Sequence, residues 1–242
     1  MNNKTISDQL YSQTKPQFDL LKLEAEKKFQ ADKIEIEKLY DFFKQLFQEK
    51  YKNLCHEITF GFFVSEYILK LNIPSANDNI DLIMLFARRL LEVLIVLKYI
   101  VKTGTYSEVI NYCIHDEYQY YEGCVTRAAA DAKLFPSLGK VDDMDKYYQE
   151  KIEELKQKHG GTGKRMPTIK KMADKTDMAE EYDYFYRFTS KLLHFCPFTL
   201  NGDMDLEHPV HKIIFVLRMA KYVENIKIEL QKISNIVKEI PS

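Results

Sequence analysis

Apolar residues recur at helical spacing along most of the chain. Positions three, four and seven residues apart share one face of an α-helix, so this repeat predicts helices that each pack one side on a core. Glycine and proline, which interrupt helices, number only 8 and 7 in 242 residues. The pattern therefore predicts an all-α protein, an up-and-down helical bundle with long helices and few turns.

The N-terminal part is helical in composition but uneven in polarity. Residues 3–72 are rich in Lys, Glu, Gln, Leu and Phe, which predicts one or two long helices. The apolar face is clearest from Ile36 onward, whereas Asn3–Ala31 is more polar and is expected to be an arm or a partner-binding helix. We expect a helical extension over residues 1–72 and a helical domain over residues 73–242, or one continuous domain formed by both.

The run Asn79–Lys102 is apolar on almost every side, as in a helix at the centre of a protein. Its polar exceptions Asp81, Arg88 and Glu92 form a narrow stripe, and the simplest interpretation of Arg88 and Glu92 is an ion pair within the helix. Charges near the middle of the run disfavour a membrane span. We therefore expect a buried helix in a cytoplasmic protein that does not enter a membrane.

The other expected helices follow in chain order. Asn77 or Asp78 is expected to cap the central helix at its start, and Gly104 to end it. The later helices are expected at about Ser107–Ala132, Val141–Lys158, Met166–Lys175, Glu180–His194 and Pro209–Lys238.

The stretch Glu180–Cys196 carries the most chemically informative pattern. At about 100° per residue one face collects Tyr182, Phe185, Tyr186, Thr189, Leu192, Leu193 and Cys196. Arg187 and His194 differ by only about 20° in direction and point away from that face. Their polar neighbours are Glu180, Asp183, Ser190 and Lys191. One interpretation is a solvated face on which Asp183 and Arg187 form an ordinary ion pair.

The same residues resemble a known signature. Arg187 and His194, with six residues between them, resemble the Arg-x(4–6)-His motif of the HEPN superfamily of all-helical domains. The set Tyr186, Arg187, Ser190 and His194 is similar to the Tyr-Arg-x-x-Ser-x-x-x-His motif of an uncharacterised bacterial branch of that superfamily. The resemblance extends over roughly residues 75–225.

The upstream pair Arg88 and Glu92 resembles the Arg-x-x-x-Glu helix of the same branch. The resemblance implies a HEPN-like bundle that cleaves RNA without metal as a homodimer, with two Arg/His pairs meeting across the two-fold axis. It also implies that the Arg88/Glu92 stripe faces and orients the helix of Arg187 and His194. Many members of the superfamily, however, are catalytically silent partners or nucleotide-binding modules.

Two functions therefore stay open. The first is a metal-independent endoribonuclease, acting as a toxin or anti-phage defence effector that an antitoxin or another regulatory protein controls. The second is a non-catalytic HEPN-like module that binds nucleotide, RNA or a protein partner.

An arginine and a histidine are sufficient for RNA cleavage because the substrate's own 2′-hydroxyl is the nucleophile. Histidine transfers protons near neutral pH, so His194 is the candidate general acid or base. Arg187 offers a bidentate fork to the phosphorane oxygens, and Ser190 and Asp183 are candidates to orient His194 or bind substrate. No cofactor or metal is expected, since the four cysteines have no metal-ligand spacing.

One segment stands out by its charge. The net charge of −1 excludes a globally basic nucleic-acid-binding protein, but Lys156–Lys175 holds seven Lys or Arg against the single Asp174, a local charge of +6. Its His159–Arg165 part resembles a P-loop but has Lys158 in place of the first glycine. We interpret that part as a flexible loop. The candidate RNA-binding residues are Lys164, Arg165, Lys170 and Lys171; the alternative is a solvated basic loop.

Overall fold

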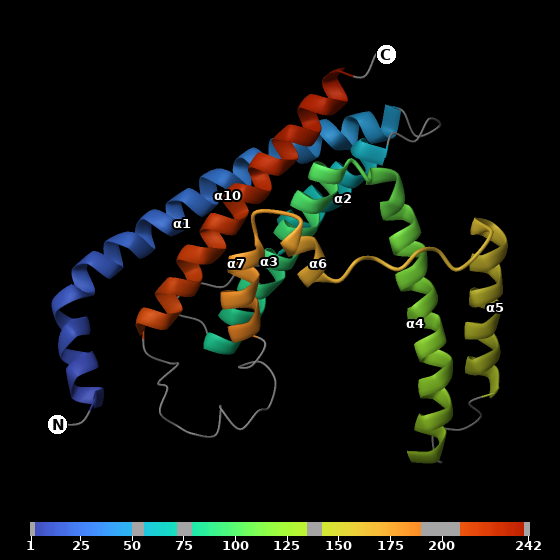
Figure 1. The fold of residues 1–242 in the computed structure, drawn as a ribbon, viewed down its shortest axis with the longest axis horizontal. Coiled ribbons are helices and arrows are strands. Elements are labelled where there is room, and N and C mark those ends of the chain that lie inside the picture. The colour runs from blue at the N-terminus through green and yellow to red at the C-terminus, as the bar shows by residue number, and fades with distance from the viewer. Residues whose placement is uncertain (1–2, 50–55, 72–78, 135–141, 190–208, 240–242) are drawn as a thin grey trace. The chain divides into compact units, whose positions relative to one another are not determined.

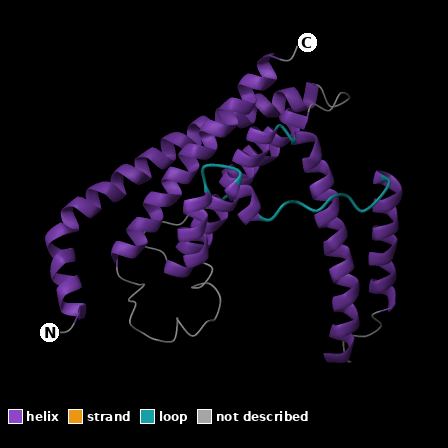
Figure 2. Ribbon diagram, viewed as in Figure 1, coloured by secondary structure: helices purple, strands orange, loops and turns teal. Residues whose placement is uncertain are grey.

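A computed structural model of the chain describes residues 3–49, 56–71, 79–134, 142–189 and 209–239 (Figure 1). These ranges contain helices and short connections and no strand, so the predicted all-α class is confirmed (Figure 2). The helices are α1 (Asn3–Glu49), α2 (His56–Lys70), α3 (Ile80–Thr103), α4 (Tyr106–Leu134), α5 (Asp142–His159), α6 (Ile169–Asp174), α7 (Ala179–Glu181), the π-helix η2 (Tyr182–Tyr186) and α10 (Pro209–Glu239). None of the helices described is long and apolar enough to cross a membrane.

The chain forms two compact units. The first combines Met1–Gly104 with Thr168–Ser242, and the second is Thr105–Pro167. Within the first unit, α1 and α2 pack against α10. The N-terminal helices therefore belong to the same unit as the C-terminal helix.

The core of the first unit lies between α3 and α10. Along α3, buried residues occur from the first turn to the last and on more than one side of the helix, and the fully buried ones include Leu90, Leu91, Leu94, Ile95 and Leu97. α10 packs against α1, α2 and α3 and contributes its own buried face. Burial of this apolar surface is the main stabilising term of such a bundle. The prediction of a central helix at this position is confirmed.

The ends of α3 show how local chemistry sets its boundaries. Asn79 caps the N-terminus, because its side chain accepts a hydrogen bond of 2.7 Å from the backbone N–H of Asp81. The cap is thus neither Asn77 nor Asp78, which lie outside the described residues. Gly104 ends the helix as predicted, with a positive φ of 65° that glycine adopts without strain. The short helix α6 likewise begins later than expected, after Thr168 caps it.

Helices α1 and α10 run side by side in the same direction (Figure 1). The residue numbers of contacting pairs differ by nearly the same amount along the two helices, as expected for parallel helices. Lys28 contacts Glu224, Asp32 contacts Lys227, and Lys238 lies over the ring of Phe42. Among residues 12–48 of α1 the buried positions are Ala25, Asp32, Ile36 and Phe43, with the 7-4-7 spacing of a coiled-coil seam. The packed part of α1 therefore extends into the stretch whose polarity suggested an arm or a partner-binding helix.

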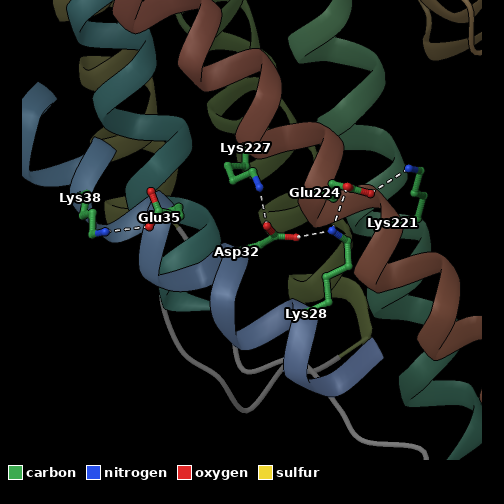
Figure 3. Close-up of polar contacts among 7 residues, drawn as sticks. All are labelled: Lys28, Asp32, Glu35, Lys38, Lys221, Glu224 and Lys227. Carbon is green, nitrogen blue, oxygen red and sulfur yellow. Dashed lines mark hydrogen bonds and ion pairs between the residues drawn. The ribbon is translucent and has the colours of Figure 1, made fainter. Parts of the chain in front are cut away.

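A chain of ion pairs crosses this seam (Figure 3). Lys227 Nζ lies 2.5 Å from one carboxylate oxygen of Asp32, whose side chain is only 5% exposed. Lys28 Nζ lies 2.9 Å from Glu224 and 3.9 Å from the second oxygen of Asp32. Glu224 also accepts a hydrogen bond of 2.8 Å from Lys221. The buried Asp32 thus fixes the register of α1 on α10, because a shifted pairing would leave its charge uncompensated.

The second unit consists of α4, α5 and the loop that follows them, and the two helices pack on each other. Tyrosines line part of their contact: the rings of Tyr121 on α4 and Tyr148 on α5 lie 6.3 Å apart. Their neighbours Tyr120 and Tyr147 are exposed at the edge of the same cluster. The rings of Tyr121 and Tyr148 thus contribute to the packing of α4 on α5.

Candidate functional site

Arg187 directly follows a π-helical turn. α7 continues into η2, and the backbone N–H of Arg187 donates to the carbonyl oxygen of Tyr182, five residues back. Turns of this kind occur as short bulges in α-helices and are frequent at functional sites. The wider turn changes the directions of residues after it relative to those before it, which a constant 100° per residue does not anticipate. His194 and Ser190 lie outside the described residues, so their alignment with Arg187 stays a prediction.

The described part of this helix has the predicted apolar and polar faces. Phe185 is 1% exposed and packs edge-on against Phe215 and Tyr222 of α10, with ring centroids 5.4 and 5.9 Å away. Thr189 is fully buried. Arg187, in contrast, has a side chain that is 66% exposed. The guanidinium is therefore accessible to a ligand while the helix that carries it is anchored in the core.

The two sequence motifs meet through one arginine and one tyrosine. Arg88 of α3 donates a hydrogen bond of 2.7 Å from Nη2 to the hydroxyl of Tyr186, the residue before Arg187. The same guanidinium lies 4.3 Å from the centroid of the Tyr186 ring, and its Nε is 3.2 Å from Glu92. The ion pair within α3 is thus present, and Arg88 also faces the segment that carries Arg187. These side chains come from positions 98 residues apart.

Tyr186 is one of two stacked tyrosine rings that lie between two cations and form a row with them. It stacks on Tyr182 with centroids 4.6 Å apart and planes inclined by 17°. Lys170 of α6 lies over the other ring of the pair, 5.4 Å from the centroid of Tyr182. Burial raises the pKa of the Tyr182 phenol, so it is neutral at physiological pH. The row joins α3, η2 and α6, with Arg88 at one end and Lys170 at the other.

Asp183 connects two cations on the exposed side of this row. Its Oδ2 lies 3.0 Å from Lys170 Nζ, and its Oδ1 lies 3.5 Å from Arg187 Nε. Lys170 also contacts Asp174 within α6 at 2.8 Å. The hydrogen bonds to Asp174 and then Asp183 raise the pKa of Lys170 above its usual range, so the amine stays charged. The predicted pair of Asp183 and Arg187 is present, but the participation of Lys170 was not expected.

Two carboxylates, those of Asp177 and Glu181, hold the segment between α6 and η2 on its neighbours. Lys98 of α3 donates hydrogen bonds of 2.8 Å to both carboxylate oxygens of Asp177. Glu181 accepts hydrogen bonds from both Arg218 and Tyr222 of α10. Burial, followed by the contact with Glu181, raises the pKa of Tyr222. These contacts position the backbone of η2 between α3 and α10.

Sequence reasoning did not identify Glu181, Arg218 and Tyr222 as a group. The partners of Glu181 lie 37 and 41 residues further along the chain. Arg218 also covers the ring of Phe185, 4.9 Å from its centroid. Such a cluster has no local signature, because each residue alone fits an ordinary polar position on a helix. Only the packing of η2 on α10 brings them together.

The expected basic segment is divided between the two units. Lys164 and Arg165 belong to the second unit, whereas Lys170 and Lys171 lie on α6 of the first. Acidic residues elsewhere in the chain compensate part of its charge, since Lys164 pairs with Glu108 at 2.7 Å. The segment is therefore not one continuous cationic surface within either unit.

The glycine-rich part of this segment is held against α4, although a flexible loop was expected. Lys164 N–H donates a hydrogen bond of 3.1 Å to the carbonyl of Asn111, and His115 Nδ1 lies 3.3 Å from the carbonyl of Thr162. Gly163 has a φ of 71°, and a Cβ there would lie 2.4 Å from the carbonyl oxygen of Asn111. Glycine is required at this point by both conformation and close approach.

In the ranges that the structure describes, no three His, Cys, Asp or Glu residues are grouped so that they could hold a metal ion. A family model matches residues 71–211 of the chain; it is described as a family of unknown function (DUF5677). The chain belongs to this family. The matched residues include both Arg88/Glu92 and Arg187/His194. No curated protein and no solved structure matches the chain.

Proposed function

We propose that this member of the DUF5677 family is a metal-independent endoribonuclease of HEPN type, with Arg187 and His194 as its catalytic residues. The observation that carries the proposal is the contact between Arg88 and Tyr186. It links the two motifs of the HEPN resemblance at the residue directly before Arg187. An ion pair whose only role was to neutralise charge within α3 would not need to reach Tyr186.

The chemistry follows from the residue types. Arg187 binds the scissile phosphate and stabilises charge as it develops on the phosphorane oxygens. His194 accepts the proton of the 2′-hydroxyl as a general base, or donates a proton to the leaving 5′-oxygen as a general acid, and either role contributes typically 10²–10⁴-fold to a rate. Acid–base cleavage usually requires two proton-transfer groups. A homodimer that brings two such helices together across a two-fold axis supplies the second one.

The contacts around η2 support this assignment through positioning. Arg88 and Glu92 orient Tyr186 from α3, and Glu181 is held from α10 by Arg218 and Tyr222. A backbone fixed from both sides limits the movement of the residue that follows it. Such preorganisation is what electrostatic stabilisation of a transition state requires. As a cytoplasmic toxin or anti-phage effector, the enzyme would need an antitoxin or another regulatory protein to restrain it.

A non-catalytic module is the second candidate, and one observation favours it. Asp183 contacts both Lys170 and Arg187, so the exposed cations next to the motif are partly neutralised within the chain. A module that binds nucleotide, RNA or a protein partner needs only that these cations become available to a ligand. It does not need His194 to transfer a proton.

The deciding experiment measures cleavage of a mixed RNA by the purified full-length protein in EDTA. The expected products carry 2′,3′-cyclic phosphate ends, because the nucleophile is the substrate's own 2′-hydroxyl, and DNA is left intact. Arg187→Ala and His194→Ala are each expected to lose nearly all activity. Arg187→Lys is also expected to fail, since a point charge does not reproduce the bidentate fork.

Arg89→Ala provides the matched control. Arg89 lies next to Arg88 and pairs with the same Glu92, but its side chain is 60% exposed. This variant is expected to keep wild-type activity and helix content. Activity that requires added Mg²⁺, or that persists in His194→Ala, would exclude the mechanism. A protein that binds RNA but cleaves none would be the non-catalytic module.

A further inference from the structure

Two cations from different elements converge on one exposed carboxylate. Lys170 comes from α6 and Arg187 follows η2, and each contacts a different oxygen of Asp183, at 3.0 and 3.5 Å. The side chains of Lys170, Asp183 and Arg187 are 36%, 46% and 66% exposed. The three charged groups are therefore all within reach of a ligand from solution.

We propose that Asp183 is an internal counter-ion that occupies the position of a substrate phosphate. In the bound state, Lys170 and Arg187 together hold the anionic oxygens of a phosphodiester, and Asp183 is displaced into solvent. The identification of the ligand as an RNA phosphate rests on the proposed function. Lys170 is assigned as the second phosphate-binding cation because Lys170 and Arg187 contact the same carboxylate, that of Asp183.

The exchange is physically reasonable because ion pairs at this exposure are weak. A phosphodiester between two cations accepts charge-assisted hydrogen bonds from both, and the arginine fork matches its geometry. The contact of Asp183 with Arg187 Nε, at 3.5 Å, is longer than its contact with Lys170, at 3.0 Å. Displacing Asp183 therefore removes only a weak contact from Arg187. It also needs no backbone movement, because Asp183 is on the exposed side of the helix.

Lys170 is held in place by contacts that do not involve Asp183. Its amine lies 2.8 Å from Asp174 within α6 and 5.4 Å from the ring centroid of Tyr182. Tyr182 in turn stacks on Tyr186, which Arg88 fixes from α3. The amine therefore stays beside Arg187 when Asp183 leaves, and the cationic pair does not have to be assembled by the ligand.

The test is the affinity of the full-length protein for a fluorescently labelled 2′-O-methyl RNA oligonucleotide at low ionic strength. This probe carries the same phosphates as RNA, but its blocked 2′-oxygen cannot attack them. Asp183→Asn is expected to bind about fivefold more tightly than wild type, as expected for the loss of one unit charge at about 4 Å in water. The gain is expected to decrease as salt is added.

Asp174→Asn is the matched control because it removes the same charge from the other carboxylate partner of Lys170. It does not remove a partner of Arg187, so its gain should be clearly smaller. The gain from Asp183→Asn should also shrink in an Arg187→Gln background and in a Lys170→Gln background. Equal gains for Asp183→Asn and Asp174→Asn, or a gain unaffected by either background, would overturn the proposal.

Cleavage of unmodified RNA by wild type separates this inference from the proposed function. If wild type cleaves RNA but Asp183→Asn binds the probe no more tightly, the counter-ion role is wrong and the ribonuclease stands. If Asp183→Asn shows the specific gain while no RNA is cleaved, the phosphate site stands and the ribonuclease does not. Absence of probe binding by every variant would overturn the phosphate site.

Discussion

Replacing Lys227 by methionine is expected to be the most destabilising single change in the ion-pair chain between α1 and α10 (Figure 3). Lys227 is the close partner of Asp32, at 2.5 Å, and both side chains are largely buried. Methionine keeps the length of the aliphatic stem but removes the charge. The carboxylate of Asp32 then remains buried, and the cation left beside it is Lys28, whose Nζ is 3.9 Å away.

The magnitude follows from the burial of Asp32. Removing one partner of a buried ion pair costs about 3–5 kcal/mol, because the remaining charge is left without compensation. The remaining contact with Lys28 places the expected loss near the lower end, about 3 kcal/mol. Lys221→Met in the same network is the control, since Lys221 is 64% exposed and Glu224 keeps Lys28. An exposed pair of this kind contributes only about 0–1 kcal/mol.

The assay is urea unfolding followed by far-UV circular dichroism. With a slope of about 3 kcal/mol per M, Lys227→Met should lower the midpoint by about 1 M, and Lys221→Met by a small fraction of that. Adding Asp32→Asn to Lys227→Met should recover part of the loss, because the uncompensated charge is removed. If Lys227→Met lowered the midpoint no more than Lys221→Met does, the ion pair would not stabilise the α1–α10 seam.

Three further predictions concern assembly, RNA binding and pH. The protein is expected to be a homodimer whose interface includes the helix of Arg187 and His194, and a monomer mass by light scattering at micromolar concentration would contradict this. Four cations are changed to Glu together: Lys164, Arg165, Lys170 and Lys171. This change should weaken RNA binding and flatten its dependence on salt, because fewer counterions are released. An unchanged slope of log K against log salt concentration would indicate a solvated segment. Hydrogen bonds from Lys221 and then Lys28 lower the pKa of Glu224 from 4.5 to about 2. Its contribution to stability is therefore complete above about pH 4.5 and is lost as the pH falls toward 2, so the urea midpoint of Glu224→Gln should change less than that of wild type over this interval.

The segments that form helices were predictable from sequence, because their apolar residues recur with a strong helical period. Asn79–Lys102 was expected to be central and α3 is, since a helix with little polar surface can be stable only inside the protein. Gly104 ends α3 as expected, because the requirement for a positive φ is local. The cap at Asn79 was missed by one or two positions, since Asn77, Asp78 and Asn79 are all suitable cap residues in sequence.

The position of α1 was less predictable because its stabilising contacts are not local. Its polar character up to Ala31 suggested an arm or a partner-binding helix, but Ala25 and Asp32 are buried, and Asp32 pairs with Lys227 of α10. A buried aspartate is indistinguishable in sequence from a solvated one. Its partner Lys227 lies 195 residues away, so the pairing is visible only in the folded chain.

The candidate site was predictable in its residue types and not in its geometry. The pair of Asp183 and Arg187 follows from a spacing of four residues on a helix, and it is present. The π-turn at Tyr182–Tyr186 was not anticipated, because no feature of the five residues distinguishes them from an α-helical turn. Lys170 was expected as one of four candidate RNA-binding residues, but its contact with Asp183 was not expected, since that contact depends on how α6 packs beside η2.

The proposed ribonuclease activity is tested most directly by a pair of oligonucleotides in EDTA. One is an RNA that the protein cleaves, and the other differs only by a 2′-deoxy nucleotide on the 5′ side of the cleaved bond. Wild type is expected to cleave the first at an unchanged rate with and without Mg²⁺ and to leave the second intact at that position, because the nucleophile is missing. Cleavage of both oligonucleotides at the same bond, or cleavage that EDTA abolishes, would contradict the proposed mechanism.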